Sequence, residues 1–215
     1  MISSISNLKI KLVRALQSKR KEREERRLFV VEGVRLAEEA ARAGVAPTLV
    51  LHTNDLDPRA QAAIDALARL GAPVELVSPA VMQAASDTKT PQGILAVVPF
   101  PPSSVVGRPS FSLVLDRLSD PGNLGAILRT ADAAGVQAVC LAPGTVDAYN
   151  PKVVRAAMGA HFHLPLVESD WDELKKRLAG LEVWLAEARE GEPYARVAWR
   201  KPCALVIGSE AAGPR

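Results

Sequence analysis

The chain has 215 residues, 48% hydrophobic and only 4% aromatic, with a formal net charge of +3. This length suits one large domain or two small ones, with a core built mostly from Ala, Leu and Val. No apolar run approaches the length of a membrane span, and the N-terminus lacks the apolar segment of a secretory signal. Cys140 and Cys203 lie in apolar strand-like runs, which favours reduced core cysteines. We therefore expect a cytoplasmic protein without a membrane partner.

Residues 1–27 carry nine Lys or Arg against three Glu, a net charge of +6, which leaves −3 for the remainder. Leu8, Leu12 and Leu16 predict one apolar face on a helix that is otherwise basic. This charge pattern favours contact with RNA, although a solvated helix with Glu–Arg pairs would look similar. The candidate phosphate contacts in this segment are Lys9, Lys11, Lys19, Arg20 and Arg23.

Strand and helix signals alternate between residues 28 and 98 and predict a small α/β domain. Strands are expected at 28–31, 48–52, 74–77 and 93–98, and helices at 34–42, at 58–70 and after Ser78. With the basic helix, this first domain spans residues 1–98. Residues 99–110 hold four prolines, one glycine and three serines, which predicts a linker stiffened by proline.

The second domain, residues 111–215, opens with a predicted buried strand at 111–115 and a turn at Asp120-Pro121-Gly122. Asn123 is expected as the N-cap of a helix that ends near Gly135. Asn123 and Arg129 then lie within two turns of a helix that starts at the carboxyl end of a strand. Open α/β sheets bind ligands there, although an ordinary amphipathic helix explains the pattern about as well.

The rest of this domain continues the alternation. Strands are expected at 138–142, 183–186 and 204–207, and helices after Asn150 and at 171–178. Lys152 and Arg155 lie near the start of the first of these helices, which suits a phosphate, although solvated side chains are an equal alternative. His161 and His163 alternate on a strand-like run and lack a third ligand, so we expect a surface strand and no metal site.

Several enzyme classes are excluded by missing motifs. The chain has no G-x-G-x-x-G after a strand, no P-loop, no G-x-S-x-G and no C-x-x-C. Dinucleotide-binding, nucleotide-hydrolysing, serine-hydrolase and thiol-redox functions therefore lack their sequence signals.

Three segments of the second domain resemble, in order, motifs of the SpoU (TrmH-type) ribose methyltransferases of the SPOUT class. They are residues 120–131, 150–160 and 205–210, and within the second the chain has Ala157 where that family usually has serine. The first domain resembles the family's L30e-like substrate-binding domain at residues 7–11, 29–33 and 88–93. The expected fold class is α/β, with an L30e-like α/β domain followed by a SPOUT (α/β knot) methyltransferase domain.

The resemblance implies transfer of a methyl group from S-adenosylmethionine to a ribose 2′-hydroxyl of ribosomal or transfer RNA, by a homodimer formed through the methyltransferase domain. Arg129 would bind the target phosphate and stabilise the developing alkoxide, and Asn123 would orient Arg129 or the ribose. Asn7 would join the RNA contacts. The implied cofactor contacts are Leu141, Ala142, Pro143, Gly144, Gly208, Ser209 and Glu210. The alternatives are an RNA-binding protein of this fold without catalysis, and a small-molecule enzyme with an incidental basic arm.

The third motif stops at Arg215, whereas the family continues into an Ile-Pro-Met-like turn and a Ser-Leu-Asn-Val-like helix start. Those pieces supply much of the cofactor pocket and the threaded tail of the trefoil knot. On this basis we expect the 215-residue form to have an incomplete knot, to bind the cofactor weakly or not at all, and to show no methylation.

Overall fold

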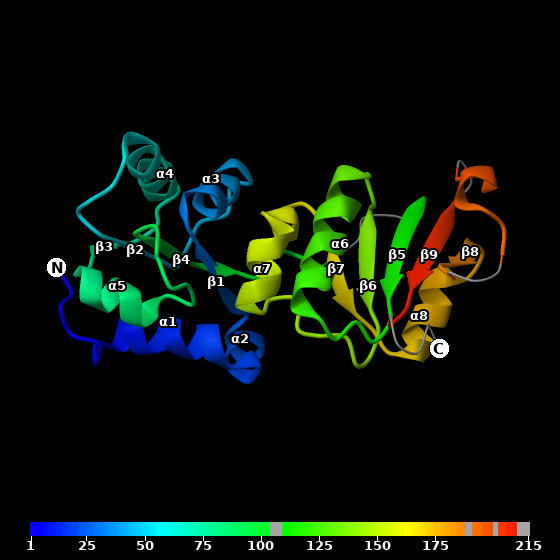
Figure 1. Cartoon of the computed structure of the whole chain (residues 1–215), viewed down its shortest axis with the longest axis horizontal. Helices are drawn as coiled ribbons and strands as arrows, with labels where there is room; N and C mark the ends of the chain where they lie inside the picture. Colours follow the sequence, from blue (N-terminus) through cyan, green and yellow to red (C-terminus); the bar gives the residue numbers. More distant parts are fainter. Residues whose placement is uncertain (104–108, 188–190, 200–201, 210–215) are drawn as a thin grey trace.

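The computed structural model describes residues 1–103, 109–187, 191–199 and 202–209, which form two α/β domains. Figure 1 shows their sheets toward opposite ends of the molecule, with helix α7 (Pro151–Ala157) between them. None of the described helices is long and apolar enough to cross a membrane. The strands and helices predicted for both domains are present, mostly within one or two residues of the expected ends, except for the strand expected at His161 and His163.

The first domain has a four-stranded sheet in the order β1-β4-β2-β3, in which β4 runs antiparallel to β1 and β2, and β2 runs parallel to β3. The strands are β1 (Leu28–Glu32), β2 (Leu49–His52), β3 (Val74–Leu76) and β4 (Ile94–Pro99). Because alternate side chains point to opposite faces, Phe29 and Val31 pack beneath helices α3 (Val34–Arg42) and α4 (Pro58–Arg69). Val30 packs on the other face, against α1 (Leu8–Ser18) and α5 (Pro79–Ala85).

The basic segment forms two helices rather than one, because Lys19 is extended (φ −123°) and separates α1 from α2 (Arg20–Arg26). The predicted leucine face was wrong at Leu8, which is 81% exposed, whereas Ile10, Val13 and Leu16 are fully buried. At about 100° per residue, Leu8 lies roughly 140° around α1 from that buried face. The face that packs on α5 and β1 therefore has a spacing of three residues, not four.

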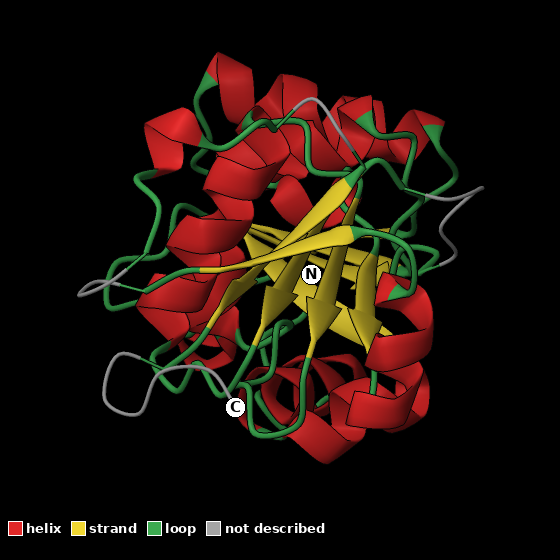
Figure 2. Cartoon of the chain, turned by 90° about the vertical axis from the view of Figure 1, so that its right-hand side faces the viewer, coloured by secondary structure: helices red, strands yellow, loops and turns green. Residues whose placement is uncertain are grey.

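The second domain has a five-stranded, fully parallel sheet in the order β7-β6-β5-β9-β8. The strands are β5 (Phe111–Leu115), β6 (Ala138–Leu141), β7 (Leu166–Glu168), β8 (Glu182–Leu185) and β9 (Cys203–Ile207). Helices α6 (Pro121–Ala133) and α7 cover one face, and α8 (Trp171–Leu178) packs on the other. Figure 2, viewed from the end of the molecule that carries this domain, shows the strands side by side with helices around them.

Two local expectations in this domain are corrected. Helix α6 begins at Pro121, and its N-cap is Asp120 rather than Asn123, because the Asp120 side chain accepts the Asn123 backbone N–H at 2.7 Å. Proline suits the first helical position, where no backbone donor is needed. Residues 160–162 form a short 3₁₀ helix after Gly159 (φ +103°), and the strand starts only at Leu166, so His161 is buried rather than on a surface strand.

The two domains meet through an aromatic cluster as well as the linker. Tyr149 of the second domain stacks on Phe100, which directly follows β4, with ring centroids 3.6 Å apart, and lies 5.0 Å from Phe29 of the first domain. The His161 and Phe162 rings also lie near Phe29. Stacked and tilted aromatic pairs contribute about 0.5–1.5 kcal/mol each beyond area burial. This cluster therefore fixes how the domains are arranged, which the sequence patterns did not predict.

The buried His161 predicts a loss of stability in acid. Its Nε2 lies 2.7 Å from the Ala148 carbonyl, and burial lowers the pKa of the ring to about 4 from an ordinary 6.5. Between those pH values the unfolded chain binds the proton and the folded chain does not, so stability present above pH 6.5 is lost as pH falls toward 4, by up to about 3 kcal/mol. Urea unfolding at pH 7 and pH 4.5 measures this loss.

The matched control is His163, which is exposed and lies 3.1 Å from Asp132. His161→Gln should reduce the pH dependence between 4.5 and 7, whereas His163→Gln should leave most of it. Equal pH dependence in the wild type and His161→Gln would contradict the assignment.

Candidate active site

The carboxyl ends of the parallel strands bring the predicted cofactor residues to one edge of the second sheet. From β5 the chain moves outward to β6 and β7, then crosses to β8 and returns beside β5 at β9. The Asp116 backbone N–H donates to the Ile207 carbonyl at 2.9 Å where these two strands end. Ligands of open α/β sheets bind at such a reversal of strand order. Gly208 and Ser209 follow β9 at this point, and Glu210 lies outside the described residues.

On the other side of β5, Leu141 ends β6, and Ala142, Pro143 and Gly144 follow it. Because neighbouring strands lie about 4.8 Å apart, the ends of β6 and β9 are roughly 10 Å from each other. The structure thus places the two predicted cofactor segments along one edge, separated by the end of β5. Gly144 has φ +91°, and a Cβ there would lie 3.1 Å from the Arg117 Cγ, so this turn requires glycine.

A pocket of about 340 Å³ adjoins the loop after β6. Its lining includes residues 141–146, residues 168–170 and Arg20 of helix α2. The Arg20 Nη2 lies 3.2 Å from Glu168 and its Nε lies 2.5 Å from Glu24, and the hydrogen bond that Arg20 donates to Glu24 raises the pKa of the guanidinium. The pocket therefore has walls from both domains.

A larger pocket, of about 800 Å³, lies on the other flank beside the end of β8. Trp184, Leu185, Ala186 and Glu187 line it from β8 and the residues that follow. The backbone N–H of Ala186 donates to the Val206 carbonyl at 2.9 Å, which holds this segment beside β9. The sequence patterns did not predict the opposite wall of this pocket, which residues between Gly191 and Trp199 form, because residues 187–201 are charged and poorly patterned. Its one signal was the group of aromatic residues in that run, including Tyr194 and Trp199.

The two candidate catalytic residues lie on α6 but on different faces. Both side chains are exposed, and they are six residues apart, which places them about 9 Å apart along the axis and about 120° apart around it. Side chains on a helix meet when they are three or four residues apart. Asn123 therefore does not hold Arg129 directly. Arg129 makes no hydrogen bond or ion pair among the described residues, and it lines none of the pockets described here.

The candidate RNA residues fall into three groups. Lys11, Lys19 and Lys152 are exposed. Lys9 pairs with Glu75, and Arg155 donates to Asp87 at 2.9 Å, so both cations are partly neutralised. The Asn7 side chain caps α1 by accepting the Lys9 backbone N–H at 2.9 Å.

For Arg23 the expectation is corrected. Its side chain is 4% exposed, and its Nη2 and Nε lie 2.5 Å and 2.9 Å from the same oxygen of Asp147. An arginine enclosed in this way has no open face toward an RNA phosphate. The periodicity of a charged helix did not reveal this, because the partner lies 124 residues away.

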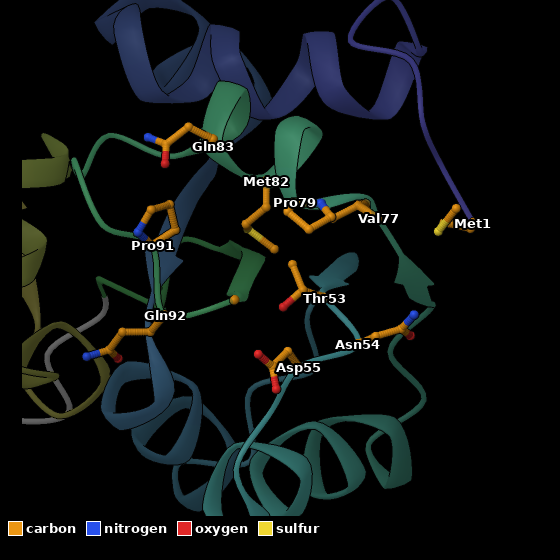
Figure 3. Close-up of a pocket in the computed structure, with 11 residues that line it drawn as sticks. Met1, Thr53, Asn54, Asp55, Val77, Pro79, Met82, Gln83, Pro91 and Gln92 are labelled. Atoms are coloured by element: carbon orange, nitrogen blue, oxygen red, sulfur yellow. The ribbon is translucent and has the colours of Figure 1, made fainter.

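A third pocket, of about 480 Å³, lies in the first domain (Figure 3). Thr53 and Asp55 follow β2 on one side, Met82 of α5 lies across from them, and Gln92 belongs to the loop before β4. The described residues that line it include no lysine or arginine. The structure described here also holds no group of three or more His, Cys, Asp or Glu side chains that could bind a metal ion.

Comparisons with known protein families match both domains. Residues 110–215 match the SpoU rRNA methylase family, and residues 7–96 match the MRM3-like substrate-binding domain. An AdoMet-bound rRNA methyltransferase from Sinorhizobium meliloti has a similar fold. Its TM-score is 0.86 and its sequence identity is 28%, with 100% of this chain and 82% of that chain covered.

Two curated proteins show the relationship at sequence level. The 23S rRNA (guanosine(2553)-2′-O)-methyltransferase RlmP of Bacillus subtilis is 36% identical, with 99% of this chain and 83% of that protein covered. The mitochondrial rRNA methyltransferase 3 of Xenopus tropicalis is 45% identical over 47% of this chain, which spans 27% of that longer protein. With a matching domain model for each half, the chain belongs to the SpoU rRNA methylase family, the S-adenosylmethionine-dependent RNA 2′-O-methyltransferases of the SPOUT class.

Proposed function

We propose that this protein transfers a methyl group from S-adenosylmethionine to a ribose 2′-hydroxyl of ribosomal RNA. The observation that carries the proposal is the similarity over 99% of the chain to a 23S rRNA 2′-O-methyltransferase. The sequence motifs alone left ribosomal and transfer RNA open. A substrate-binding domain joined to a methyltransferase domain is the organisation expected for an enzyme that recognises RNA at one place and modifies it at another.

The carboxyl edge of the second sheet fits this cofactor. It offers Gly144 in a conformation that requires glycine, Gly208 after β9, and pockets on both sides of β5 within the 300–1,000 Å³ range usual for ligand sites. When bound, S-adenosylmethionine supplies an electrophilic methyl group on a sulfonium. Leu141–Gly144 and Gly208–Glu210 would hold it, because backbone groups at glycines allow close approach.

Arg129 acts as a fixed cation. Guanidinium groups in proteins are generally poor bases, because they hold their proton strongly. A positive charge beside the ribose would bind the target phosphate and stabilise the alkoxide that develops at the 2′-oxygen. The hydroxyl proton then passes to phosphate or water. Of the two roles considered for Asn123, orientation of the ribose agrees with its separation from Arg129.

A homodimer through the methyltransferase domain and a trefoil knot are part of the same proposal, together with a cytoplasmic location. Arg129 is exposed on α6 and lies about 12 Å along the axis from the helix start at the carboxyl edge. A second copy packed on α6 would bring Arg129 to the partner's cofactor edge. This arrangement explains how an arginine that lines none of the three pockets described above can act in the chemistry.

The RNA would be held by the exposed cations of both domains. Replacing Lys11 and Lys19 with glutamine should flatten the dependence of log K on log salt by about 0.7 to 0.9 for each lost phosphate contact. Lys175→Gln on α8, across the sheet from α6 and α7, is the matched control and should leave the slope unchanged. Deleting residues 1–27 is a poor test, because Ile10, Val13 and Leu16 belong to the core. Fluorescence anisotropy from 50 to 300 mM salt gives the slope.

Methylation mapping tests the function itself. Methylation is mapped in ribosomal and transfer RNA from a deletion strain. We expect 2′-O-methylation to be lost at one position of the ribosomal RNA, and the full-length protein should restore it with labelled S-adenosylmethionine. Loss of methylation at a position of transfer RNA would contradict the proposal that ribosomal RNA is the substrate. RNA binding without any cofactor binding or methyl transfer would favour an RNA-binding protein of this fold.

A further inference from the structure

We propose that Arg23, a residue of the substrate-binding domain, is a positioning residue for the catalytic domain: it holds the loop 142–150 in its working shape. This inference rests on the proposed location of the cofactor, because the loop begins with Ala142–Gly144 and ends with Asn150 at the start of α7. One predicted cofactor segment and the start of the motif at 150–160 thus depend on a side chain from the other domain.

The contacts of Arg23 join three segments. Two of its nitrogens donate to Oδ2 of Asp147, and its Nη1 donates to the Leu16 carbonyl at 2.5 Å, at the end of α1. The planar guanidinium can serve both directions at once because its donors form a rigid fork. Arg23 therefore binds a carbonyl near the end of α1 and the catalytic-domain loop with the donors of one planar group.

Asp147 connects Arg23 to the backbone of the loop. Its second oxygen accepts the Tyr149 backbone N–H at 2.8 Å, and the Tyr149 ring stacks on Phe100, directly after β4. On the other side, the Thr145 hydroxyl donates to the Leu115 carbonyl at 3.0 Å, and the Val146 N–H donates to Leu118 at 2.8 Å. The loop is therefore anchored to β5 before Asp147 and to the first domain at Asp147.

Removing Arg23 would leave the Asp147 carboxylate enclosed without its counter-charge. A buried carboxylate in that state turns toward water or takes up a proton, and either change moves the backbone around it. Gly144 is three residues away and lines the pocket beside β6. A shift of about 1 Å in positioning groups can lower a rate by about 100-fold. Arg23 thus affects catalysis without touching RNA or cofactor.

The test uses Arg23→Lys, Arg23→Met and Asp147→Asn in the full-length protein. We expect kcat to fall by about 10- to 100-fold in each, with the RNA dissociation constant and its salt slope unchanged. Amide hydrogen exchange should become faster in residues 144–150 and stay unchanged in β1 and β4. Arg26→Gln is the control, because it breaks an exposed pair with Glu22 on the same helix and should leave kcat and loop exchange unchanged.

Other results would overturn the inference in distinct ways. A salt slope flattened by nearly one unit in Arg23→Met, with loop exchange unchanged, would make Arg23 a phosphate contact. Faster exchange throughout both domains in all three variants would show a general structural role only. Unchanged kcat and unchanged loop exchange would remove any positioning role. If the wild type transfers no methyl group, the proposed function fails, but loop exchange still decides whether Arg23 positions the loop.

Discussion

Arg129→Ala should abolish methylation while leaving the fold and the cofactor affinity intact. Arg129 is exposed on α6 and makes no hydrogen bond or ion pair with the described residues. A guanidinium that stabilises developing charge typically contributes a factor of about 10² to 10³ in rate. Thermal unfolding should therefore match the wild type, whereas kcat should fall by at least that factor. Arg129→Lys should also be poor, because lysine lacks the planar fork that meets a phosphate through two donors.

Near-normal turnover by Arg129→Lys would show that a point charge suffices. The proposed dimer can be tested with the same variant. Arg129→Ala and a cofactor-defective Gly208→Val, each inactive alone, should regain activity when mixed and allowed to exchange subunits, because a mixed dimer holds one intact site. No recovery after confirmed exchange would place Arg129 and the cofactor edge in the same chain.

Gly125→Val should strongly destabilise the protein. Gly125 lies in α6 where it crosses α7, and a Cβ there would be 2.4 Å from the Ala156 Cβ and 2.7 Å from the Val153 carbonyl oxygen. These neighbours are a short side chain and backbone, so the helices themselves must separate. Overpacking of this kind costs about 3 kcal/mol, which corresponds to a fall in Tm of roughly 6–12 °C for a chain of this size.

Ala126→Val is the matched control, because the neighbouring Ala126 is exposed. This substitution should lower stability only by the helix-propensity difference of a β-branched residue, about 0.5 kcal/mol. Differential scanning calorimetry of the two variants gives the comparison. Equal melting temperatures would mean that α6 and α7 do not pack closely at Gly125. Ala157, which takes the place of the serine usual in the family, is also buried at this crossing.

The sequence by itself determined the order and type of nearly all elements. Alternating apolar patterns, helix caps such as Asp57 and Asn150, and Gly or Pro at the ends are local signals, so they can be read without knowing the tertiary contacts. The motifs at 120–131 and 150–160 likewise identified the family before any geometry was known. The sequence pattern placed the cap of α6 at Asn123, and the structure places it at Asp120, because the Asp120 side chain meets a free backbone donor.

Only the tertiary structure decided what the charged residues do. Arg20, Arg23 and Lys19 look alike in a basic segment, yet one lines a pocket, one is buried against Asp147 and one is exposed. Arg20 and Arg23 have partners, Glu168 and Asp147, that lie more than 100 residues away, and no local pattern encodes such a distance. The burial of His161 has the same cause, since the aromatic cluster that encloses it forms only when the two domains pack together.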